Sequence, residues 1–223
     1  MTSKELTEIL RSDEFRHELE EMSSYLASIM QERPIVNLLT KYLWRRGYNV
    51  ELEDKKCDLT GNGKKLEFKF NYDKMAEEKL IVELQTWSNL TEMCDAVSAK
   101  PSIKNWGVMP RIHQDVCVKK PDLFVWIICS RDLSKVPVEH LCRINLSKEQ
   151  RDYNAEHPYG EDLAFLSVAN SLLERLQPVR PFSVVQEAVV TDGDFPSTYH
   201  FLICEFSKPN GTTNQSVQAN PEA

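Results

Sequence analysis

The chain has 223 residues, 41% hydrophobic and 27% charged, which is typical of a folded globular protein and excludes fibrous and low-complexity architectures. Its formal net charge of −7 argues against general attraction to nucleic acid, so nucleic-acid binding would need a local basic surface. The sequence has no apolar run of about 18 residues, so we expect no membrane span, no signal peptide and a cytoplasmic location. The six cysteines include no C-x-x-C pair, and we expect them to be reduced and structural.

Helices are predicted in the N-terminal part of the chain. The residues from Thr2 to Glu5 have the spacing of a capping box, and the amphipathic stretch up to Met30 indicates one or two helices, divided near Ser12. A further helix has Pro34 in its first turn, apolar residues at helical spacing and Gly47 as its stop.

A β-hairpin is predicted between Lys55 and Phe70, because Asn62-Gly63 tolerates the positive φ angles of a two-residue type I′ turn. In that register Asp58 stands directly opposite Glu67, and both share a face with Lys69. Opposed like charges about 4.5–5.5 Å apart are destabilising. We therefore expect a positive group, either Lys69 or a divalent cation, between the two carboxylates. The other face should be apolar, with Cys57, Leu59, Leu66, Phe68 and Phe70.

The remaining pattern alternates between helices and strands. Up to residue 129 we expect a strand at 48–52, helix from Lys74 to Lys100, a loop-like region containing Pro110 and His113, and a strand buried on both faces at 123–129. The C-terminal part should contain a polar helix that begins at Ser147, an amphipathic helix at 161–176 and strands at 182–190 and 199–206. A disordered tail is expected after Lys208.

These elements predict an α/β protein with a mixed α+β sheet. We expect one domain over residues 1–207, with a core at about 32–130, an N-terminal helical segment at 1–31, a C-terminal extension at 131–207 and a disordered tail at 208–223.

The core order of helix, three-strand meander, helix and buried strand, with Asp58 on the second strand and Glu67-Phe68-Lys69 on the third, resembles the restriction-endonuclease-like PD-(D/E)xK nuclease superfamily. The resemblance covers roughly Glu32 to Cys129. Cys57 stands where the family has proline, and Glu-x-Lys also occurs at Glu53 and Glu77, so the tripeptide alone is not specific.

The resemblance implies a Mg²⁺-dependent DNA endonuclease, a phosphodiester hydrolase of the restriction type in which Mn²⁺ substitutes for Mg²⁺. Asp58 and Glu67 would bind the metal, and Lys69 would activate the attacking water, which makes these three the catalytic residues. The Phe68 carbonyl and Glu32 would be further metal ligands. Such enzymes usually act as dimers, so we expect a homodimer bound to DNA.

Structural explanations stand beside these roles. The hairpin is also compatible with a surface hairpin held by salt bridges in a catalytically inactive nuclease-fold protein or an α/β interaction module. Glu32 also suits a first-turn glutamate stabilised by the helix dipole. His113 and Cys117 have metal-ligand spacing, but a loop histidine and a packed cysteine explain them better. The tryptophans are expected in the core. A three-residue turn would shift the partner of Glu67 to Cys57.

Overall fold

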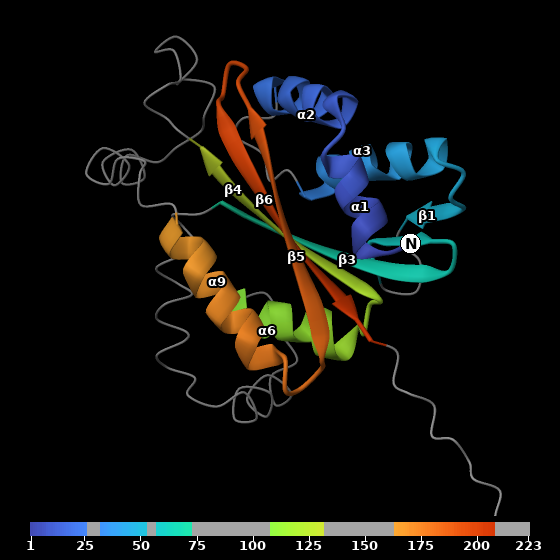
Figure 1. The fold of residues 1–223 in the computed structure, drawn as a ribbon, viewed down its shortest axis with the longest axis vertical. Helices are drawn as coiled ribbons and strands as arrows, with labels where there is room; N and C mark the ends of the chain where they lie inside the picture. Colours follow the sequence, from blue (N-terminus) through green and yellow to red (C-terminus); the bar gives the residue numbers. More distant parts are fainter. Residues whose placement is uncertain (26–31, 53–56, 73–107, 132–162, 208–223) are drawn as a thin grey trace, which may run out of the picture.

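The computed structural model describes residues 1–25, 32–52, 57–72, 108–131 and 163–207 (Figure 1). Helices and a mixed sheet make up this part of the chain, as expected from the sequence. The elements are α1 (Ser3–Leu10), α2 (Asp13–Tyr25), α3 (Glu32–Arg45), β1 (Val50–Leu52), β2 (Leu59–Gly61), β3 (Lys64–Tyr72), α6 (Val108–His113), the π-helix η3 (Gln114–Val118), β4 (Leu123–Arg131), α9 (Leu163–Leu176), β5 (Phe182–Thr191) and β6 (Ser197–Phe206).

The six strands form one sheet in the order β1-β2-β3-β4-β6-β5. Strands β1, β2 and β3 are joined as an antiparallel meander, and β4 lies parallel to β3. Strand β6 pairs antiparallel with both β4 and β5, so the last described strand lies inside the sheet. The sheet is therefore mixed, and its single parallel pair joins β3 to β4.

Helices cover both faces of this sheet. Helices α1, α2 and α3 lie on one face, and α6 and α9 lie on the other (Figure 1). Strand β4 supplies both cores, because Val125 and Ile127 join the first apolar cluster while Phe124 and Trp126 join the second. The prediction that this strand is covered on both faces is confirmed, since every β4 residue is buried.

The N-terminal helices begin where the sequence signals predicted, and α3 also ends where they predicted. Thr2 and Glu5 form the capping box of α1, and α2 starts just after Ser12. Helix α3 ends in a Schellman motif at Gly47, which has φ of +82°, because the N–H of Tyr48 donates to the carbonyl of Leu43 at 3.1 Å.

The predicted register of the β2–β3 hairpin is confirmed from Leu59–Leu66 to the turn, where Asn62 and Gly63 have φ of 50° and 77°. The pairing ends at Leu59, however, so Asp58 is not a cross-strand partner of Glu67 as predicted. The apolar face is confirmed for four of the five predicted residues: Leu59, Leu66, Phe68 and Phe70.

Cys57 corrects the fifth of these predictions. Its side chain is buried but belongs to neither apolar cluster. Burial raises the pKa of its thiol, and the negative charge of Glu67 raises it further, so Cys57 lies near the polar face of the hairpin. Strand alternation does not extend to Cys57 because the chain leaves the strand before Leu59.

The region predicted as loop-like is helical from Val108 to Val118, in α6 followed by η3. Pro110 does not prevent this helix, because proline is tolerated in the first turn. The helices predicted at 74–100 and from Ser147, and the tail after Lys208, lie outside the described residues. No described helix is long and apolar enough to cross a membrane.

Candidate active site

Two carboxylates bind the backbone of β3 where β2 no longer pairs with it. We call this side of residues 67–72, turned away from β4, the open edge of β3. The N–H of Phe68 donates to Asp58 Oδ2 at 2.8 Å, and the N–H of Phe70 donates to Glu32 Oε2 at 2.8 Å. These side chains thus satisfy backbone donors that a longer β2 would have satisfied.

The open edge also carries the carbonyl of Phe68. The N–H and C=O of one strand residue point to the same side of the strand, so this carbonyl shares a side with the N–H bound to Asp58. Phe68 and Phe70 are two residues apart, which separates their N–H groups by roughly 6.7 Å. Asp58 and Glu32 therefore bind the strand at successive positions along one line.

The Glu67 side chain points away from the open edge, where Asp58 and Glu32 bind the backbone of β3, and toward the face covered by α6 and α9. It pairs in register with Phe124, whose side chain belongs to the cluster on that face. Glu67 is 2% exposed, and its Oε1 contacts the ammonium of Lys119. Its Oε2 is buried and has no hydrogen-bond partner. A buried carboxylate oxygen without a partner is costly, so this atom has unused capacity for a cation or donor.

The cation at Glu67 is not the one expected from the sequence. Lys69 or a divalent cation was expected between Asp58 and Glu67, but Lys69 Nζ lies 3.9 Å from Glu32 Oε2. Lys119 contacts Glu67 instead, and its Nζ also lies 2.8 Å from Asp115 Oδ1. Lys69 therefore pairs with Glu32, and Lys119 pairs with Glu67 and Asp115.

Asp115 and Lys119 are the site residues that the sequence reading missed. They are four residues apart on and just after η3, where the N–H of Lys119 donates to the carbonyl of Gln114 at 3.0 Å. Single π-turns of this kind are frequent at functional sites. The Asp-x-x-x-Lys spacing brings the two side chains together in a helix. The sequence predicts a loop in this region, so the spacing did not indicate an ion pair.

The site holds its carboxylates in an environment that disfavours their charge. Burial raises the pKa of Glu67 to about 8, although the Lys119 hydrogen bond lowers it. Burial also raises the pKa values of Asp58 and Glu32 above their ordinary range, against the backbone bond at Asp58 and the Lys69 charge at Glu32. The negative charge of Asp115 raises all three pKa values further.

Opposite effects act on Lys119. Burial lowers its pKa, but the hydrogen bonds to Asp115 and Glu67 outweigh burial and hold that pKa above its ordinary value. The ammonium therefore stays charged at neutral pH. Among the described residues of the site there are four carboxylates and only two ammonium groups: Glu32, Asp58, Glu67 and Asp115, with Lys69 and Lys119.

Oxygen donors and excess negative charge suit a hard divalent cation such as Mg²⁺. Within the described residues, no three His, Cys, Asp or Glu side chains are grouped so as to hold a metal ion. Mg²⁺ does not need such a group, because it is usually held by one or two carboxylates and keeps several waters. The unpartnered Oε2 of Glu67 and the Asp58 carboxylate fit that requirement in donor type and charge.

The chain matches no protein-family model, no curated protein and no solved structure. Its function has to be argued from the site itself. The other metal candidate contributes little to that argument: His113 is buried in α6, in place of the predicted loop, and Cys117 is half-buried in η3.

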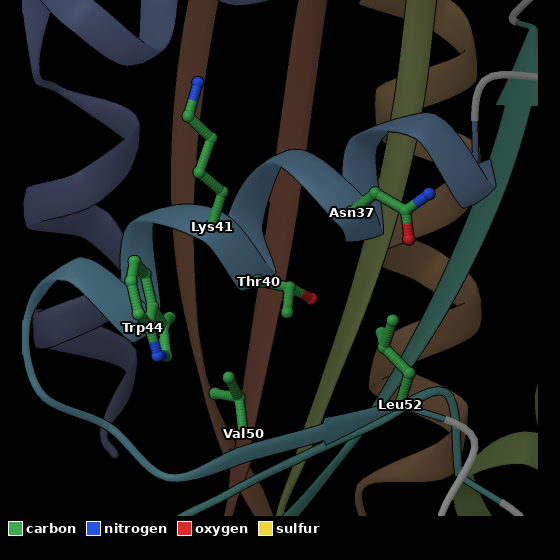
Figure 2. Close-up of a pocket in the computed structure, with 6 residues that line it drawn as sticks. All are labelled: Asn37, Thr40, Lys41, Trp44, Val50 and Leu52. Atoms are coloured by element: carbon green, nitrogen blue, oxygen red, sulfur yellow. The ribbon is translucent and has the colours of Figure 1, made fainter.

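A shallow groove of about 440 Å³ lies between α3 and β1 (Figure 2), and none of the four site carboxylates lines it. Trp44 at its end is 69% exposed, so the expectation that the tryptophans lie in the core is wrong here and correct for Trp126, which is fully buried. Trp44 lies in the last turn of α3. The groove is lined by Asn37, Thr40, Lys41, Trp44, Val50 and Leu52.

Proposed function

We propose that the chain is a Mg²⁺-dependent DNA endonuclease with a core of the restriction-endonuclease-like PD-(D/E)xK type. The observation that carries this proposal is the gathering of Asp58, Glu32 and the Glu67-Phe68-Lys69 segment around one strand, β3. That strand ends an antiparallel meander and is followed by a parallel strand, as in the sequence pattern that suggested the family. The extensions at 1–31 and 131–207 complete the proposed single domain.

The charges of the site support a divalent cation. The carboxylates outnumber the ammonium groups among the described residues, and one buried oxygen of Glu67 has no partner. Asp58 and Glu67 would hold Mg²⁺, with the Phe68 carbonyl and Glu32 as further ligands, directly or through water. When bound, the metal would stabilise charge on the phosphate and lower the pKa of a bound water.

The residues of the chain have distinct roles in this proposal. Lys69 would supply a positive charge that orients the attacking water and favours its deprotonated form, because its ammonium lies by Glu32 at the open edge of β3. Glu32 would hold that ammonium in position, since the same carboxylate is fixed by the N–H of Phe70. Lys64 and Lys65, in the strand that leaves the turn, would provide a local positive charge for the DNA backbone, and Lys64 Nζ also lies 3.9 Å from Glu205 Oε1.

The partner is DNA, and a homodimer would place two such sites on the two strands. Cleavage of supercoiled and linear DNA in the presence of Mg²⁺ or Mn²⁺ tests the proposal. Lys69→Ala should lower the rate by about 100-fold or more, as expected for loss of a charged group that stabilises the developing charge. Lys4→Ala, which removes the same charge from an exposed position of α1, should leave the rate unchanged. Absence of cleavage by the wild type, or equal rates in all three proteins, would refute it.

A non-catalytic role for the same fold is supported by one specific observation. Lys119 already forms ion pairs with Glu67 and Asp115, so part of the cluster is satisfied without a metal. In that case the protein would be an inactive nuclease-fold protein or an interaction module. Calorimetric titration with Mn²⁺ separates the two functions, because binding that disappears in Asp58→Asn supports the nuclease and absence of binding supports the module.

A further inference from the structure

We infer that the ammonium of Lys119 occupies the cation position beside Glu67 and Asp115, here called the Glu67 pocket, when no metal is bound. A divalent cation that binds in this pocket displaces the ammonium. Lys119 is thus a positioning residue for the cation site and has no contact with the reacting atoms in this role. The inference rests on the cation site of the proposed function but does not depend on DNA cleavage.

The contacts of the ammonium carry the first step. Lys119 Nζ contacts Glu67 Oε1 and lies 2.8 Å from Asp115 Oδ1. Glu67 is 2% exposed and Asp115 is 6% exposed, so water cannot solvate either carboxylate well. The ammonium is therefore the main positive charge that stabilises this pair of buried acids.

The second step is that the ammonium leaves the pocket incompletely satisfied. Glu67 Oε2 is buried without a hydrogen-bond partner, although the ammonium lies at the other oxygen of the same carboxylate. Asp58, whose charge also acts on Glu67, adds negative charge that Lys119 alone does not balance. A hard divalent cation carries twice the charge of an ammonium and takes several oxygen ligands, so it suits this pocket better.

Lys119 also has a place to move. Its side chain is 28% exposed, so its end can reach solvent while it keeps its bond to Asp115. The N–H of Lys119 donates to the carbonyl of Gln114 in η3, and η3 is held by Arg180, which donates to the carbonyl of Val116 at 2.6 Å and lies 3.6 Å from the centre of the Phe206 ring. The exchange therefore needs only rotation of one side chain, with η3 remaining in position.

Thermal unfolding of Lys119→Met tests the inference. Without divalent cations the variant should lose roughly 10 °C of melting temperature, because a buried ion pair loses one partner. Mg²⁺ or Mn²⁺ should restore most of this loss and should raise the melting temperature of the wild type by only a few degrees. Lys120→Met, which removes the same charge from the exposed neighbouring residue, should behave like the wild type. A lysine with a purely structural role would give a loss that the cations do not restore.

Lys119→Gln provides the second measurement if the methionine variant does not fold, since glutamine keeps a hydrogen-bond donor and removes the charge. It should bind Mn²⁺ about tenfold or more tightly than the wild type in calorimetry, while Lys119→Arg should bind it no more tightly. Equal affinity of the wild type and Lys119→Gln would overturn the inference. Tighter binding without DNA cleavage by the wild type would support the inference and refute the nuclease.

Discussion

The two hairpins of the sheet differ in how far their pairing continues. Strands β5 and β6 pair over ten residues, from Phe182–Phe206 to Thr191–Ser197, without a break in register. Strands β2 and β3 pair over three residues only, although β3 continues for six more. In the long hairpin, each strand supplies the hydrogen-bond partners for the backbone groups of the other. Along β3, two carboxylates supply these partners instead.

This difference explains why the acidic residues gather at the short hairpin. A strand that loses its neighbour exposes N–H groups at alternate residues, and each of them attracts an acceptor. Asp58 and Glu32 fill these positions from a loop and from a helix, which brings together residues that are distant in sequence. The long hairpin pairs its backbone groups within the sheet, and the short one gathers the carboxylates of the candidate site.

The largest effect should come from the long hairpin. Phe201 on β6 is fully buried in the cluster that packs against α1, α2 and α3, so Phe201→Ala should lower the free energy of unfolding by about 3–5 kcal/mol. Urea unfolding measures this change. Mn²⁺ affinity of the folded fraction should stay at the wild-type value, and a weaker affinity would show that the two hairpins are not separate in function.

The second effect concerns pH and the carboxylate of Glu67. Its pKa is raised from 4.5 to about 8 in the folded protein, so between these pH values the folded state holds a proton that the unfolded state has released. Stability without divalent cations should therefore fall as pH rises through this window, by up to about 1.4 kcal/mol per pH unit. Urea unfolding between these limits should show a flatter profile for Glu67→Gln. If the stability of the wild type and of Glu67→Gln changed equally with pH, the assignment of this proton to Glu67 would be wrong.

The third effect acts on the turn of the short hairpin. Gly63 has φ of 77°, which a β-branched residue adopts only with strain, so Gly63→Val should cost about 1–3 kcal/mol. Gly63→Asn should cost less, because asparagine tolerates this conformation. Thermal unfolding compares the two variants, and Mn²⁺ titration shows whether the strain reaches Asp58. Equal stability of both variants would show that the turn does not set the register.

The smallest effect is expected outside both hairpins. Trp44 is 69% exposed, so Trp44→Ala should change the free energy of unfolding by about 0.5 kcal/mol or less. Thermal unfolding checks this value, with Trp126→Ala as the matched buried tryptophan, which should cost about 3–5 kcal/mol. A large loss in Trp44→Ala would mean that the groove of Figure 2 is covered in solution.

Local signals were sufficient to predict most of the described elements, but not α6 and η3, and part of the site. The turn at Asn62-Gly63 fixed the register of β2 and β3, and the apolar run before Cys129 predicted the strand buried on both faces. Glu32 was predicted as a further acidic residue from the resemblance, and the structure brings it to β3 beside Lys69. These signals succeed because turn geometry and strand burial depend on neighbouring residues.

The rest of the site depends on contacts that no local pattern specifies. Lys119 reaches Glu67 only because η3 precedes β4 and β4 pairs with β3, so the contact depends on tertiary structure. The expected opposition of Asp58 and Glu67 failed because the pairing stopped one residue early and the carboxylate turned to the N–H of Phe68. One residue of strand length thus decides whether two acids face each other.

The position of β6 has a consequence for how the protein folds. This strand is the last one described along the chain, yet it lies between β4 and β5 in the sheet. Strand β4 can complete its pairing only after β6 has been synthesised and inserted, so the central sheet forms late and through contacts between distant residues. Until then the apolar strand from Leu123 has one unprotected side, and a nascent chain is most prone to aggregate at this stage.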